Sequence, residues 1–129
     1  MKILIDTDVL LDVGLNRPAF VQDSAQVLRW AAGTQNGGVA WHSLTNCSYI
    51  LKDNGRRFLG GLIKMIKVVS VSHADAARAL QLPMKDLEDA FQTSAALAMG
   101  ADWIITRNLS DFKFSPVPAL DPKSFLLEI

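Results

Sequence analysis

The sequence lacks most of the features that stabilise secreted or membrane proteins. Its single cysteine, Cys47, excludes an internal disulfide and is typical of a reducing cytosol. No apolar run approaches the ~20 residues that a membrane span requires. The first apolar run begins after Lys2 and already ends at Asp6, which is unlike a signal peptide. We therefore expect a cytoplasmic protein that is not bound to a membrane.

The chain also lacks a net charge, because 13 Lys and Arg residues balance 13 Asp and Glu residues. Without a global basic field, it can bind nucleic acid only through a local patch. Six basic residues could form a rim that contacts phosphates: Lys52, Arg56, Arg57, Lys64, Lys67 and Arg107. Solvated surface charge is the commoner explanation, and we favour it. Neither His42 nor His73 has a cysteine or glutamate beside it at zinc-binding spacing.

Half of the 129 residues are apolar, which is enough for one domain with a proper core, and we assign residues 1–129 to a single domain. Short apolar runs alternate with stretches of helical spacing, so the fold class is α/β. We expect a three-layer α/β/α sandwich around a mainly parallel sheet of about five strands. The expected strands are residues 2–5, 39–41, 68–71, 103–106 and 117–120, the last at an edge.

Helices are expected over residues 6–13, 21–32, 44–52, 56–64, 73–82, 86–100 and 121–128. We interpret Gly37 and Gly38 as part of a breaker, and Ser43 as the N-cap of the third helix. The tryptophans at positions 30, 41 and 103 occupy apolar positions, which indicates the core rather than base-stacking platforms. Cys47 is expected to be a buried free thiol.

Acids follow the strands at the edge where open α/β sheets bind ligands. Asp6 ends the first buried strand, and the fourth strand ends on Thr106 and leads into a polar loop with Asp111. Because parallel strands end at the same edge, these two acids can meet although they are far apart in sequence. Asp12 could assist them, but a surface position is at least as well supported.

The helix over residues 86–100 brings further acids towards that edge. Asp86, Asp89 and Thr93 share one side of it, and the opposite side is apolar from Leu87 to Ala98. Carboxylates in a first helical turn also cap free N–H groups and suit the helix dipole, so a purely structural role stays open. Taken alone, Asp89 is more often structural than functional.

Together, Asp6, Asp89 and Asp111 would repel one another unless a cation lay among them. Oxygen ligands without histidine or cysteine select Mg²⁺ or Mn²⁺ over Zn²⁺. Such an ion activates water and stabilises the charge that develops in phosphodiester hydrolysis. The acids therefore point to a metal-dependent hydrolase that acts on a phosphodiester.

Three segments together resemble the PIN-domain family of nucleases: residues 3–12 (ILIDTDVLLD), 85–92 (KDLEDAFQ) and 105–112 (ITRNLSDF). The resemblance implies a ribonuclease that depends on Mg²⁺ or Mn²⁺, with Asp6, Asp89 and Asp111 as its catalytic and metal-binding acids. Many members of this size are VapC-type toxins of toxin–antitoxin pairs. It therefore also implies an RNA substrate and a small antitoxin, with a homodimer as one expected assembly.

The same resemblance assigns supporting residues and exposes two departures. Thr7 and Thr106 match hydroxyls beside the metal site, and Asn108 belongs to the last motif. Asp8 stands where the family usually has asparagine. More seriously, Asn46 stands where the family has its second acid, normally a glutamate.

An asparagine can offer Mg²⁺ a carbonyl oxygen but no charge. With Asn46 in place of an acid, we expect weaker metal affinity or help from Asp8 or Asp86. The chain would then be a weak nuclease, or one that uses a rearranged set of acids.

Two other functions remain open. The run Asp6-Thr7-Asp8 resembles the start of haloacid-dehalogenase-like phosphatases, which transfer a phosphoryl group through an aspartate. That chemistry also needs a phosphate-binding lysine and usually a cap domain, for which the sequence offers no clear candidates. Asn46 would also suit a PIN-like binding module that has lost its catalytic power. We favour the ribonuclease.

Overall fold

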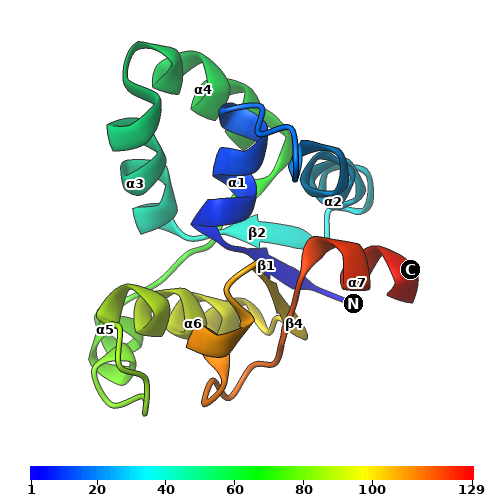
Figure 1. Ribbon diagram of the computed structural model, residues 1–129. Coiled ribbons are helices and arrows are strands. Elements are labelled where there is room, and N and C mark those ends of the chain that lie inside the picture. Colours follow the sequence, from blue (N-terminus) through cyan, green and yellow to red (C-terminus); the bar gives the residue numbers. More distant parts are fainter.

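Five short parallel strands form one sheet at the centre of the computed structural model, which describes all residues 1–129 (Figure 1). The strands are β1 (Ile3–Ile5), β2 (Gly37–Val39), β3 (Lys67–Val68), β4 (Trp103–Ile105) and β5 (Ala119–Leu120). They lie in the order β3-β2-β1-β4-β5, and every neighbouring pair is parallel. The predicted parallel sheet of five strands is confirmed, with β1 in the middle and β5 at an edge.

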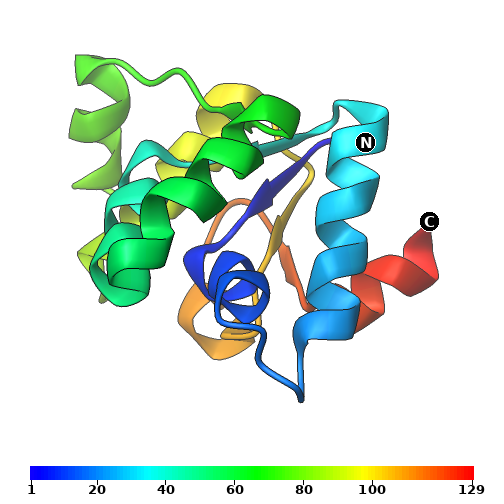
Figure 2. The ribbon, with the colours of Figure 1, turned by 90° about the horizontal axis from the view of Figure 1, so that it is seen from above.

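Helices cover both faces of this sheet. They are α1 (Thr7–Gly14), α2 (Val21–Thr34), α3 (Trp41–Leu51), α4 (Gly55–Met65), α5 (His73–Ala79), α6 (Leu87–Met99) and α7 (Pro122–Glu128). Two 3₁₀ turns, η1 (Lys52–Asn54) and η2 (Leu109–Phe112), connect them. Helices α1 to α4 and α7 lie on one face, and α5 and α6 lie on the other (Figures 1 and 2). The predicted three-layer sandwich is therefore confirmed. None of these helices combines the length and apolar character needed to cross a membrane.

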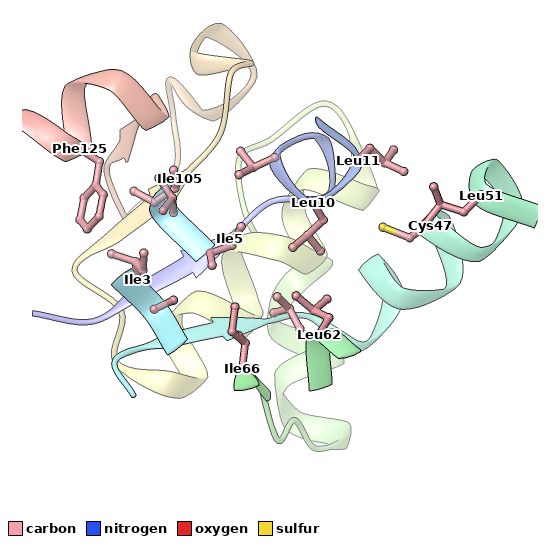
Figure 3. Close-up of a cluster of buried hydrophobic side chains, with 14 residues drawn as sticks. Ile3, Ile5, Leu10, Leu11, Cys47, Leu51, Leu62, Ile66, Ile105 and Phe125 are labelled. Carbon is pink, nitrogen blue, oxygen red and sulfur yellow. The ribbon is translucent and has the colours of Figure 1, made fainter. Parts of the chain in front are cut away.

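The side chains of β1 alternate between two cores. Ile3 and Ile5 point into the larger cluster, where they pack with Leu10 of α1 and Phe125 of α7 (Figure 3). Leu4 points to the other face and packs with residues of α6 and β4. All three strand residues are fully buried, so β1 is held rigidly from both sides. Asp6 follows this strand directly, so the position of its backbone is fixed as well.

Local capping sets several helix ends, and the predicted caps at Ser72, Asp86 and Gly100 are confirmed. Asp86 accepts hydrogen bonds from the first N–H groups of α6, and Gly100 ends that helix with a φ of 70°, a conformation that glycine adopts without strain. Ser72 and Asp75 form a reciprocal capping box at the start of α5. Such signals involve only neighbouring residues, which is why the sequence alone can locate them.

The region around β2 differs from the prediction. Gly37 and Gly38, interpreted as a breaker, form the strand itself, and α3 begins directly after Ala40. Ser43 lies inside α3 and is fully buried, so it is not the N-cap. Trp41 was expected in the core but is 68% exposed, because it starts the helix on the solvent side.

The buried side of α6 is shifted from the predicted apolar side. Leu87 and Phe91 of that side are exposed, whereas Asp89, Thr93 and Ala96 are buried along with the rest of the helix middle. Ala96 and the other small residues allow the helix to approach the sheet closely, and the Thr93 hydroxyl donates to the backbone carbonyl of Asp89. The polar groups on this side therefore border the end of β1.

Candidate metal centre

Asp6 lies at the carboxyl end of β1 and is only 4% exposed. Its Oδ1 accepts a hydrogen bond from the backbone N–H of Thr7 at 2.7 Å, and its Oδ2 accepts one from the Thr106 hydroxyl at 2.8 Å. Burial, with help from the nearby charges of Asp8 and Glu88, raises the pKa of Asp6 to about 7. The site therefore orients this carboxyl group but disfavours its charge.

Asp89, in the first turn of α6, is 8% exposed, and no N–H or O–H group of the protein donates to its carboxyl group. Burial is the main reason why its pKa rises to about 8, and Glu88, Asp86 and Asp6 add to the effect. The influence of Asp6 on Asp89 shows that the two carboxyl groups lie in one electrostatic neighbourhood. Two of the three predicted acids are thus brought together.

The third predicted acid, Asp111, reaches the same region from η2. With Asp86 and Asp89 it lines a cavity of about 270 Å³, and Lys85 and Lys113 lie on the rim of that cavity. Asp111 is exposed, so solvent can reach this side of the site. Asp89 is therefore influenced by the charge of Asp6 and lines one cavity with Asp111.

Behind Asp6, a buried polar network joins three helices. The Thr7 hydroxyl of α1 donates to the Ser43 hydroxyl of α3 at 2.9 Å, and Gln92 Nε2 of α6 donates to both, at 3.2 and 2.5 Å. The sequence reasoning found Thr7 but missed Ser43 and Gln92. Their spacing along the chain gives no sign that they meet.

The supporting residues of the last motif hold the loop after β4. The Thr106 hydroxyl accepts from the backbone N–H of Asn108 at 3.0 Å while it donates to Asp6. The exposed side chain of Asn108 makes no hydrogen bond. Asp8 Oδ2 accepts from the backbone N–H of Arg107 at 2.9 Å, and burial raises the pKa of Asp8. Asp8 therefore anchors the loop through one oxygen, while its Oδ1 is buried without a hydrogen-bond partner.

Asp12, for which the sequence left a role at the site and a surface position open, is completely buried. Arg107 reaches it with two hydrogen bonds of 2.9 Å, Arg17 adds a third at 3.2 Å, and the Ser24 hydroxyl donates at 2.9 Å. The surface alternative is wrong because Arg107, 95 positions further along the chain, pairs with this carboxylate. Arg107 is consequently not free to contact phosphate, whereas the other residues of the predicted basic rim are exposed.

Asn46 lies on α3 and points its amide towards the first turn of α6. Its Nδ2 donates to Glu88 Oε1 at 2.9 Å, and His42 Nε2 lies 3.7 Å from the same oxygen. Carboxyl oxygens of Glu88, Asp86 and Asp89 lie within 4.8 Å of one another. The sequence reasoning did not assign Glu88 to the site, because a charge in a first helical turn has a sufficient local explanation.

The geometry describes a parallel α/β/α protein with a partly buried acidic pocket at the carboxyl edge of its sheet. A sequence profile of the PIN domain matches residues 2–110. The chain therefore belongs to the PIN domain family. Among curated proteins, none matches the chain.

Two solved structures have the same fold. One is a chain of VapBC2 from Rickettsia felis bound to a DNA fragment from its promoter, with a TM-score of 0.73 and 16% identity, covering 94% of this chain and 98% of that one. The other is a chain of a toxin–antitoxin complex from Klebsiella pneumoniae, with a TM-score of 0.74 and 22% identity over the same shares of the two chains. Their likeness covers nearly the full length of all three proteins.

The haloacid-dehalogenase-like alternative finds no support in this geometry. Asp6 has no ion pair with a lysine, which a phosphoryl-transfer site of that kind needs. The free thiol of Cys47 is buried, as predicted. Asp6, Asp89 and Asp111 remain the predicted acids of the PIN site.

Proposed function

We propose that this chain is a ribonuclease of the VapC type that depends on Mg²⁺ or Mn²⁺. The observation that carries the proposal is a contrast between buried aspartates. Asp12 is neutralised by Arg17 and Arg107, whereas Asp6 and Asp89 have no ion pair with a basic side chain. Buried carboxylates need a compensating cation, and here the protein supplies one for Asp12 only.

The donor set suits a hard divalent cation. Asp6, Asp89 and Asp111 offer only oxygen, and the Asp89 carboxyl group has no hydrogen-bond donor to satisfy it. These three residues would hold the ion. A donor set made only of oxygen atoms favours Mg²⁺ or Mn²⁺. When bound, the ion would supply Lewis-acid stabilisation and an acidified water.

The chain's own residues prepare that site. Thr106 and the N–H of Thr7 fix the two oxygens of Asp6, so the carboxylate does not have to reorganise when it is used. The cavity between Asp89 and Asp111 opens to solvent. An RNA phosphate can therefore approach from the open side, next to Lys85 and Lys113.

Cleavage of single-stranded RNA tests the proposal. Wild-type protein should cleave in Mn²⁺ or Mg²⁺ and stop when EDTA is added. Asp6→Asn should lose at least about 100-fold in rate, a magnitude typical of lost electrostatic stabilisation. Asp53→Asn, which changes an exposed aspartate of η1, is the matched control and should retain full activity. Cleavage that survives Asp6→Asn would remove the assignment.

We also propose a small antitoxin as protein partner, supported by the likeness to chains from toxin–antitoxin complexes. A short upstream reading frame with a DNA-binding N-terminus would encode it. Co-expression should yield a stable complex with reduced ribonuclease activity. Size-exclusion chromatography with light scattering would test the expected homodimer and the complex in one experiment.

A PIN-like binding module without catalysis is the second candidate, because Asn46 contributes no charge. Calorimetry separates the two. A folded protein that binds neither Mg²⁺ nor Mn²⁺ at millimolar concentration would favour the binding module.

A further inference from the structure

Glu88 occupies the space where helices α3 and α6 face each other beside the acidic pocket. It is partly exposed, and Asn46 of α3 donates a 2.9 Å hydrogen bond to its Oε1. Its second oxygen, Oε2, accepts no hydrogen bond and stays available. The asparagine that stands in place of the family's second acid therefore contacts a carboxylate from a different helix.

The position of that carboxylate suits the pocket. An oxygen of Glu88 lies within 4.8 Å of oxygens of both Asp86 and Asp89. The negative charge of Glu88 also contributes to the raised pKa of Asp6, at the end of β1. The negative charge that is missing from α3 is thus present a short distance away, on α6.

The neighbouring acid indicates that this cluster has a ligand. Asp89 is more than nine-tenths buried, and its carboxyl group faces Glu88 without a hydrogen-bond donor from any other residue. Asp89 lines the cavity beside Asp111, so a ligand can reach its carboxyl group. A solvated cluster of helix-capping acids would not need to bury Asp89.

The two acids that the sequence offered as substitutes each use one oxygen to hold the protein's own backbone. Asp86 Oδ1 accepts the N–H groups of Glu88 and Asp89 as the N-cap of α6. Asp8 Oδ2 is bound to the backbone of Arg107. Glu88 differs from both acids because Asn46, the residue that stands in place of the family's second acid, holds its Oε1 from α3.

Building on the proposed metal-dependent ribonuclease, we propose that Glu88 is a ligand of the divalent cation and replaces the acid that Asn46 lacks. Asn46 is then a positioning residue, which holds Glu88 Oε1 and leaves Oε2 to the ion. The site would consist of Asp6, Glu88 and Asp89, with Asp111 on the open side.

Mn²⁺ binding to the purified full chain, measured by calorimetry, tests this assignment without reference to activity. Glu88→Gln removes the charge but keeps the shape, and should weaken Mn²⁺ binding by about 10- to 100-fold. Asn46→Ala should weaken it by about tenfold, as expected for a residue that orients a ligand. Asp53→Asn, which changes an exposed aspartate of η1, is the control and should stay within about threefold of wild type.

The double variant Asn46→Glu/Glu88→Gln returns the acid to α3 and should recover most of the wild-type affinity. A structural role for Glu88 predicts no such recovery. Circular dichroism should show that each variant is folded. If Glu88→Gln does not fold, Glu88→Ala replaces it as the variant that lacks the carboxylate.

The outcomes separate this inference from the proposed function. A folded wild-type protein that binds no Mn²⁺ would remove the metal site as a whole. Wild-type binding that is unchanged in Glu88→Gln and in Glu88→Ala would overturn the role of Glu88 and leave the ribonuclease proposal intact. Weaker binding in Glu88→Gln, restored in the double variant, would establish the relocated acid.

Discussion

Arg107 holds Asp12 through two parallel hydrogen bonds, one from Nε and one from Nη2, each 2.9 Å long. The two residues are 95 positions apart, so the pair fastens the loop after β4 to helix α1. The guanidinium group also lies 3.8 Å from the centre of the Phe20 ring. This pair stabilises the framework of the site and is separate from the acids that would bind a cation.

Arg107→Ala should destabilise the protein by about 3 kcal/mol, because it leaves a buried carboxylate with Arg17 as its only basic partner. Urea unfolding would measure the loss. Arg57→Ala on exposed α4 is the control, and should change the free energy of unfolding by less than about 0.5 kcal/mol. Equal stability of wild type and Arg107→Ala would show that the pair contributes nothing.

The stability of the metal-free protein should fall as the pH rises from about 4 to about 8. The pKa of Asp6 is about 7 in the folded chain, above its ordinary 3.8. The folded state therefore holds more protons in this window than the unfolded state, and losing them costs stability. One proton contributes at most about 1.4 kcal/mol per pH unit. Asp6→Asn should reduce the slope by close to this amount.

Urea titrations in EDTA at several pH values would measure these slopes. Asp53→Asn, a neutralised surface acid, should keep the wild-type slope between pH 5 and 8. An Asp6→Asn slope equal to that of wild type would mean that Asp6 does not titrate in this range.

The sequence predicts the layers of the fold well because its signals are local. The run before Asp6, the cap at Asp86 and the glycine at position 100 each act within a few residues. The rule that parallel strands end at one edge then brings Asp6 and the loop of Asp111 to the same side. These steps need no knowledge of packing.

The misses share a different cause, since each depends on contacts between distant segments. Asp12 is buried because Arg107 reaches it, and Glu88 of α6 meets Asn46 of α3 in a hydrogen bond. Gly37 lies in a strand that packs closely against α2, so a side chain at this position would collide with the Cβ atom of Ala31. Helical spacing and turn rules contain none of this information.

Gly37→Ala should therefore destabilise the protein by about 1–3 kcal/mol through overpacking between β2 and α2. Gly33→Ala is the matched control, because a Cβ atom added there meets nothing within 4 Å. It should be neutral or slightly stabilising, as alanine is the better helix former. Thermal unfolding of the two variants would decide, and a stable Gly37→Ala protein would contradict the close packing of β2 against α2.

Cys47 should be unreactive in the folded protein. Its thiol is buried, and burial raises its pKa to about 11, so almost no thiolate is present at pH 8. A thiol reagent such as dithionitrobenzoate should react only as fast as the protein opens. Added urea should release one equivalent of thiol. Rapid labelling of the native chain at pH 8 would contradict the buried position.

Mn²⁺ should stabilise the protein more at pH 8 than at pH 6. Protons compete with the ion for Asp6 and Asp89, whose pKa values are about 7 and about 8. At 100 times the dissociation constant, the ion would add about 2.7 kcal/mol, which corresponds to a rise of about 10 °C in Tm. Differential scanning fluorimetry at both pH values would measure this, and EDTA should reverse it. Asp6→Asn should lose the shift and Asp53→Asn should keep it, whereas a shift of equal size in all three proteins would place the ion elsewhere.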